Sequence, residues 1–190
     1  EKGSLWHTGV VALGGNHFTN DIAVALRTPI PEAEKTKRRS GCALAAMVDD
    51  EETVEIASVG GRQPRVMSRR ILSEVIQPRA EEIIHQLCDE IRRAGYERSL
   101  NSGIVLTGGA SILDGMPEVA DQIFDLPVRR GYPMGIGGLN DHVNNPAFAT
   151  AVGLVLYAHR NQMSEGDYSI GVGAISRVVG RMRGLFKEFF

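Results

Sequence analysis

The chain has 190 residues, of which 43% are hydrophobic and 23% are charged, values typical of one large or two small globular domains. The formal net charge of -2 gives no overall bias toward nucleic acid. Cys42 and Cys88 stand far apart and outside any CxxC pair, which indicates a reducing compartment without disulfides. The five histidines lack metal-binding spacing, and no run of about 18 apolar residues predicts a membrane span; we also expect no signal peptide.

The start of the chain predicts a strand followed by two helices. Leu5–Leu13 is rich enough in β-branched and aromatic residues for a strand. After Gly14-Gly15, apolar residues recur at helical spacing until Thr28-Pro29 stops the helix. Pro31–Gly41 is polar, with proline at its start and glycine at its end, as expected of a second helix. Because the chain begins at Glu1 and enters a strand almost at once, we expect a fragment without its N-terminal part; the alternative is a trimmed, complete domain.

The middle of the chain predicts a hairpin and a long helix. Residues 42–48 and 53–59 are expected to form two strands joined by the acidic tip of residues 49–52. Gly60–Arg65 predicts a loop. The helix that follows, Ser68–Ala94, is the longest expected in the chain, and Pro78 should kink or split it. Its apolar stripe is expected from Ile71, Val75, Ile83, Ile84, Leu87 and Ile91.

The last third predicts a buried strand, two helices and a linker. Gly103–Gly109 is a continuously apolar strand ending in a glycine turn, typical of a buried parallel strand. A helix within residues 111–124 and a short strand in residues 128–133 follow. Asn145–Arg160 predicts an apolar, buried helix, and the Gly- and Ser-rich residues Asn161–Ile175 predict a linker.

Two diglycine turns, Gly14-Gly15 and Gly108-Gly109, each follow a strand-like stretch. Paired glycines let the backbone approach a flat ligand, and the helix that follows can face an anion. Tight strand–helix turns need glycine in any case, which is the alternative explanation. The sequence contains no Walker A or GxGxxG motif and no recognisable Ser/His/Asp or Cys/His arrangement, so neither a nucleophile nor a general base is visible.

The last fourteen residues, Arg177–Phe190, are amphipathic when placed on a helix. Their large apolar side chains fall within one arc of about 140°, and the segment carries four cationic residues and one anionic residue. Such a helix is typical of one that lies in the plane of a membrane; docking on its own domain or in a partner groove is the alternative. The expected membrane-binding residues are Val178, Val179, Arg181, Met182, Arg183, Leu185, Phe186, Lys187, Phe189 and Phe190.

Several stretches, in this order, resemble the C-terminal half of the FtsA family of bacterial cell-division proteins. They are ALGGNHFTNDIAVAL, PEAEKTKRRSGCAL, SVGGRQPRVMSRRILSEVIQPRAEEI, GIVLTGGASILDGM and AFATAVGLVLYA. The LTGGAS turn alone would indicate only the superfamily of actin, sugar kinases and heat-shock-chaperone ATPases. The third stretch and the terminal helix narrow the resemblance to FtsA.

The resemblance implies an α/β, actin-like (ribonuclease H-like) ATPase half with an inserted outer subdomain and a C-terminal amphipathic helix. Residues 1–27 and 101–160 would form the actin-like subdomain with the central sheet, and residues 28–100 the inserted subdomain. Residues 161–175 would be the linker, and residues 176–190 the membrane-targeting helix.

The resemblance also implies part of an ATP site. The matching residues are Gly14, Gly15, Glu34, Lys37, Gly108, Gly109 and Ala110, which would contact the adenosine side of ATP. Glu34 and Lys37 could equally be an ordinary ion pair on a polar helix. The phosphate-binding loops belong to the family's N-terminal half, where Mg would also be held. We therefore expect no catalytic residue, no metal ligand and no ATP hydrolysis in this chain, and at best weak nucleotide binding.

In the FtsA family, the inserted subdomain binds the C-terminal peptide of FtsZ, the tubulin-like ring protein. Arginine suits carboxylates because its planar fork can bind both oxygens, and an arginine cluster could pair with an acidic peptide; a solvated helix face is the alternative. The expected contacts are Arg62, Arg65, Arg69, Arg70 and Arg79, with Arg79 the first candidate.

The implied function is a scaffold that tethers the FtsZ ring to the cytoplasmic face of the inner membrane at the division septum. Its partners would be FtsZ, other FtsA molecules in a filament, anionic lipids and later division proteins, without nucleic acid. A sugar or acetate kinase, or a pilus-assembly actin-like ATPase, would share the diglycine turn but should lack the cationic terminal helix.

Overall fold

The computed structural model describes residues 5–135, 137 and 143–164. The chain divides into two compact units, Glu1–Thr150 and Ala151–Phe190. In the first unit the main elements follow in this order: α1 (Gly15–Leu26), α2 (Ile30–Ser40), β1 (Thr53–Ile56), β2 (Arg65–Ser68), α3 (Arg69–Arg93), β3 (Ile104–Leu106), α4 (Met116–Phe124) and β4 (Val128–Arg130). Helix α6 (Ala149–Ser164) leads into the second unit.

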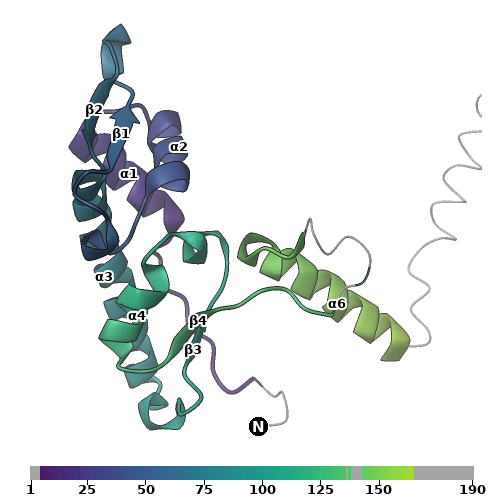
Figure 1. The fold of residues 1–190 in the computed structure, drawn as a ribbon. Helices are drawn as coiled ribbons and strands as arrows, with labels where there is room; N and C mark the ends of the chain where they lie inside the picture. Colours follow the sequence, from purple (N-terminus) through teal and green to yellow (C-terminus); the bar gives the residue numbers. More distant parts are fainter. Residues whose placement is uncertain (1–4, 136, 138–142, 165–190) are drawn as a thin grey trace, which may run out of the picture. The chain divides into compact units, whose positions relative to one another are not determined.

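Helix α3 is the central element of the first unit, with α1 and α4 packed against it (Figure 1). Ser68 caps its N-terminus, because the Ser68 hydroxyl accepts a 3.2 Å hydrogen bond from the Arg70 amide. The helix continues through Pro78 as one element, and Gly95, with φ 76°, follows its last turn. The expected helix and its ends are therefore confirmed; of the kink or split expected at Pro78, the split is wrong.

The buried face of α3 differs from the expected stripe. Leu72, Ile76, Ala80 and Ile84 recur every four residues and are completely buried, whereas Ile71 is 43% exposed. Ile83 and Ile84 were placed correctly, but the first half of the stripe lies one residue further along the chain. The core is completed by α1 and α4, which contribute Phe18, Ile22, Leu26, Met116, Val119 and Ala120.

The unit holds two small sheets at different ends of α3 (Figure 1). Strands β1 and β2 pair antiparallel, with Thr53 opposite Ser68. Strands β3 and β4 pair parallel, with Ile104 opposite Val128. The expected strand in residues 103–109 and the short strand near residue 128 are confirmed, but the expected burial of the first is wrong, because Val105 is 49% exposed.

The expected hairpin between residues 42–48 and 53–59 is wrong. Cys42 forms an isolated parallel bridge with Asp114, and Ala45–Met47 is a 3-10 turn. Strand β1 pairs instead with β2, which lies beyond the predicted loop. Residues 42–48 are rich in apolar side chains because Cys42, Ala43 and Val48 are buried in the core, not because the segment forms a strand.

The expected strand at Leu5–Leu13 is absent, since no strand of the described part of the chain pairs with these residues. A strand requires a hydrogen-bonded neighbour, and here Val10 is 93% exposed. The Trp6 ring lies near that of Tyr96, with the ring centroids 6.1 Å apart.

Helix α6 confirms the helix expected over residues 145–160, after a short 3-10 turn at Pro146–Phe148. Its expected burial is wrong: Leu154, Val155 and Tyr157 are exposed, and no other described element belongs to the second unit. The helix continues to Ser164, so the first four residues of the expected linker are helical. The rest of the linker and the terminal amphipathic segment lie outside the described residues. Among the helices that are described, none has the length and hydropathy of a membrane span.

Candidate functional site

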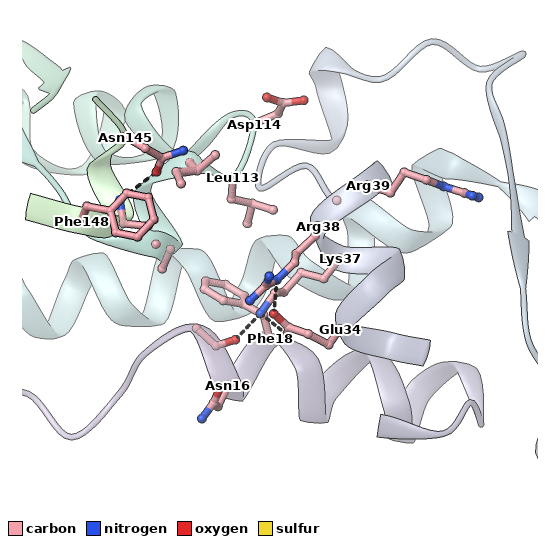
Figure 2. Close-up of a pocket in the computed structure, with 16 residues that line it drawn as sticks. Asn16, Phe18, Glu34, Lys37, Arg38, Arg39, Leu113, Asp114, Asn145 and Phe148 are labelled. Carbon is pink, nitrogen blue, oxygen red and sulfur yellow. Dashed lines mark hydrogen bonds and ion pairs between the residues drawn. The ribbon is translucent and has the colours of Figure 1, made fainter. Parts of the chain in front are cut away.

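A cavity of about 610 Å³, here called the glycine cavity, opens between the N-terminal end of α1, helix α2 and the turn that follows β3 (Figure 2). The turn after β3 is a short 3-10 helix, Gly109–Ile112, and a second one, Pro146–Phe148, lies beside it. The cavity is lined by Gly15, Asn16, Phe18, Glu34, Lys37, Arg38, Arg39, Gly41, Gly109, Ala110, Ile112, Leu113, Asp114, Asn145, Ala147 and Phe148.

The cavity brings together five of the seven residues predicted to contact adenosine: Gly15, Glu34, Lys37, Gly109 and Ala110. The other two, Gly14 and Gly108, adjoin it in the chain without lining it. A Cβ atom built on Gly15 would lie 3.7 Å from the Ala110 Cβ and 3.8 Å from the Lys37 Nζ. Residues far apart in the sequence thus meet at one surface, while their role toward a ligand stays a prediction.

The Lys37 ammonium links helix α2 to the start of α1. Its Nζ atom donates to the Gly15 carbonyl and to the Thr19 hydroxyl, both at 2.9 Å, and lies 2.6 Å from the Glu34 carboxylate. Figure 2 shows Glu34 and Lys37 together on one side of the cavity. The ordinary ion pair weighed as an alternative is therefore present, and it forms one wall of the cavity.

Glu34 is held ionised by its neighbours. Burial would raise the pKa of its carboxyl, but hydrogen bonds from Lys37, Thr19 and Arg38 outweigh burial and lower the pKa from 4.5 to about 2. Arg38 donates from Nε to the second carboxylate oxygen at 2.7 Å. Both oxygens of Glu34 are thus engaged within the chain, so a ligand hydroxyl would have to share one of them.

The opposite wall depends on the glycine turn after β3. Gly108 has φ 89°, a left-handed conformation that favours glycine, and its amide donates to the Pro146 carbonyl at 3.0 Å. Arg130, at the end of β4, stabilises this turn by donating hydrogen bonds to the carbonyls of Ser111 and Leu113 at 2.8 and 2.9 Å. The backbone of Gly109 and Ala110 therefore faces the cavity in a defined position.

Several lining residues were missed by the sequence reasoning. Arg38 and Arg39 follow Lys37 directly on α2, so their place on the same helix could have signalled them. Asn145 and Phe148 belong to a segment interpreted only as a buried helix. The Asn145 side chain caps the 3-10 turn by accepting from the Ala147 amide at 2.9 Å, which turns Phe148 toward the cavity rim (Figure 2).

Four of the five arginines predicted to bind a peptide contact acceptors within the chain. Arg79 donates hydrogen bonds from Nε and Nη2 to the Asp21 carboxylate, at 2.7 and 3.1 Å, and also forms an ion pair with Glu82. Arg65 donates to the Leu26 carbonyl, and Arg70 pairs with Asp50.

Arg69 contacts three acceptors: the Ser40 carbonyl and the carboxylates of Glu52 and Asp114. For Arg62, no contact is found among the side chains that the structure describes. The peptide-binding role of these arginines stays a prediction.

Comparison with known proteins identifies relatives over most of the chain. The family model for cell division protein FtsA matches residues 1–153. FtsA of Pseudomonas aeruginosa is 44% identical over 175 residues, covering 92% of this chain and 42% of that protein. FtsA of Escherichia coli K12 is 41% identical over 197 residues, covering 98% of this chain and 47% of that protein. The chain thus spans a little under half the length of these relatives.

Solved structures of an actin-like protein share the fold. MreB5 of Spiroplasma citri bound to ADP matches with a TM-score of 0.60 at 15% identity, covering 81% of this chain and 46% of that one. The same protein bound to AMPPNP matches with a TM-score of 0.60 at 16% identity, covering 83% and 47%. These likenesses show an actin-like fold. Since the family model covers most of the chain, the chain belongs to the cell division protein FtsA family.

Proposed function

We propose that this chain is the part of a cell-division scaffold that supplies one wall of an adenine nucleotide site and tethers the FtsZ ring to the cytoplasmic face of the membrane at the septum. The observation that carries the proposal is the match to the FtsA family over residues 1–153, together with a cavity whose lining includes five of the seven residues expected to contact adenosine.

The glycine cavity fits an adenosine group in size and chemistry. It has room for a ligand of that size, and it combines exposed glycine backbone with apolar and cationic side chains. The MreB5 structures with a similar fold hold ADP or AMPPNP. Here Gly109 and Ala110 would face the base, while Glu34 and Lys37 would lie beside the ribose. Mg and the phosphates would be held by residues outside this set, so the chain would bind nucleotide weakly and hydrolyse none.

The nucleotide proposal is tested by titrating the 190-residue chain with ADP. A Gly109→Leu substitution adds a side chain where a Cβ atom would have only Ala147, 4.0 Å away, so it would fill the cavity without a backbone clash. We expect it to abolish ADP binding. Gly153→Leu on α6, which has open space around its Cβ position, is the control and should bind as the unmodified chain does. Equal affinity in all three proteins would overturn the nucleotide proposal.

The terminal segment would supply the membrane contact. Each cation near an anionic surface adds about 1 kcal/mol, and Arg177–Phe190 carries four of them beside its apolar face. We expect the chain to sediment with anionic liposomes, less so at high salt, and to lose this binding when residues 177–190 are deleted. Binding that survives the deletion would place the membrane contact elsewhere.

The peptide contact would lie on the inserted segment, residues 28–100. A carboxylate of an FtsZ peptide would have to compete with Asp21 and Glu82 for Arg79, since both already occupy its guanidinium. An Asp21→Asn substitution should therefore tighten peptide binding, whereas Arg79→Gln should weaken it. The opposite order would show that Arg79 is structural only.

A further inference from the structure

The first residue of α3, Arg69, connects three separate segments of the first unit. Its Nε donates to the Ser40 carbonyl at 2.8 Å, its Nη1 to the Glu52 carboxylate at 2.6 Å, and its Nη2 lies 3.5 Å from the Asp114 carboxylate. The side chain is only 21% exposed. The Glu52 hydrogen bond, outweighing partial burial, raises the pKa of Arg69, so the guanidinium stays charged. We call these four residues the Arg69 bridge.

The backbone beneath the bridge is closely packed. The Ala43 amide donates to the Asp114 carbonyl at 2.6 Å. A Cβ atom on Gly115, whose φ is 75°, would lie 2.8 Å from the Leu44 amide nitrogen, closer than real Cβ contacts. The chain after α2 and the chain before α4 thus meet without room for a side chain between them.

The glycine cavity has two walls, and each of these two segments lies at the end of one wall. Helix α2 carries Glu34 and Lys37 on one wall, and its last residue, Ser40, accepts from Arg69. The other wall runs from Gly109 to Asp114, where the second carboxylate of the bridge is located. The Arg69 guanidinium therefore contacts a residue at the end of each wall, although Arg69 itself does not line the cavity.

We infer that Arg69 is a positioning residue that fixes the spacing of the two cavity walls and links that spacing to the β1–β2 sheet, through Glu52 just before β1. The inference rests on the proposed nucleotide site and adds its regulation. A partner that moves the β1–β2 sheet or the start of α3 would change the fit of the cavity to an adenine nucleotide, and a bound nucleotide would in turn favour one position of that sheet.

The neighbouring Arg70 provides a matched control. It pairs with Asp50, on the acidic loop, and among the described residues it makes no hydrogen bond or ion pair with Ser40 or Asp114. Removing either arginine deletes one charge at adjacent positions, yet only the loss of Arg69 removes contacts to the ends of both walls.

The experiment compares amide hydrogen exchange in the 190-residue chain, Arg69→Gln, Arg69→Lys and Arg70→Gln. We expect Arg69→Gln to speed exchange about tenfold or more at Ala43 and at residues 113–115, with little change at the α1–α3 core. Arg69→Lys should be intermediate, because lysine keeps one charge but cannot reach three acceptors. Arg70→Gln should match the unmodified chain in these segments. The same proteins are titrated with ADP, and Arg69→Gln should weaken binding about 3- to 10-fold.

Unchanged exchange in Arg69→Gln, an equal effect in Arg70→Gln, or a uniform rise across the core would overturn the inference. Should Arg69→Gln not fold, Glu52→Gln removes one negative charge of the bridge and should give the same local pattern at smaller size. If the unmodified chain binds no ADP, the proposed nucleotide function fails, while the exchange pattern still decides whether Arg69 fixes the walls.

Discussion

Replacing Glu34 by glutamine should destabilise the chain and remove part of its acid sensitivity. Glu34 is ion-paired with Lys37, which is only 12% exposed, so Glu34→Gln leaves a largely buried cation with neutral acceptors. Exposed ion pairs contribute up to about 1 kcal/mol, and breaking buried ones costs about 3–5 kcal/mol. Because the Glu34 side chain is 30% exposed, we expect Glu34→Gln to lower the free energy of unfolding by about 1–3 kcal/mol at pH 7.

The lowered pKa of Glu34 determines how its contribution to stability depends on pH. The folded pKa of Glu34, about 2, lies below the ordinary value of 4.5, so its contribution is present above pH 4.5 and is lost as the pH falls toward 2. A pKa difference of that size corresponds to at most about 3 kcal/mol, which solvent screening reduces.

Urea denaturation between pH 7 and pH 3 is the assay. The difference between the unmodified chain and Glu34→Gln should shrink steadily below pH 4.5. Glu32→Gln, which breaks the exposed Lys35 pair on the same helix, is the control and should change stability little. Glu34→Gln within about 0.5 kcal/mol of the unmodified chain at pH 7, with a parallel pH profile, would refute the reasoning.

Three further outcomes follow from local geometry. Ser68→Ala removes the cap of α3 and should cost about 0.5–2 kcal/mol in urea denaturation, whereas Ser68→Thr should retain most of it. Gly103→Ala places a Cβ atom 2.2 Å from the Pro127 carbonyl oxygen at φ 79°, so it should cost more than 1 kcal/mol; a neutral result would contradict the observed turn. Ellman's reagent should modify the half-buried Cys88 well before Cys42, whose thiol pKa is raised by burial; simultaneous modification would mean that the core around Cys42 opens readily.

Sequence patterns predicted best where one local signal decides the structure. Proline and glycine at the ends of α2, and a serine followed by a long periodic stretch, fixed two helices almost to the residue. The apolar run ending in Gly108-Gly109 likewise predicted a parallel strand. These features depend on capping and burial, which neighbouring residues determine.

The failures occurred where the outcome depends on distant partners. Leu5–Leu13 has strand composition but no neighbour to pair with in the described part of the chain, and residues 42–48 are buried without forming a strand. Composition cannot reveal which strand lies opposite. The cavity was anticipated only through the family resemblance, because Lys37 and Ala110 are far apart in the sequence and no spacing rule connects them.

The arginines illustrate a second limit. Their clustering in the sequence favoured one cationic surface, yet Arg79 pairs with α1 and Arg69 joins three segments. The number of arginines in a segment does not show which of them are already paired within the chain. Only an arginine without such a partner can bind an acidic peptide without first breaking an ion pair.

The most direct test of the tether is a liposome flotation assay with a fluorescent peptide of the FtsZ C-terminus. With anionic liposomes and the 190-residue chain, the account predicts that the peptide floats with the lipid, and that it stays in solution when the chain lacks residues 177–190. Peptide that remains in solution with the complete chain present, although that chain itself floats, would contradict the proposed link between ring and membrane.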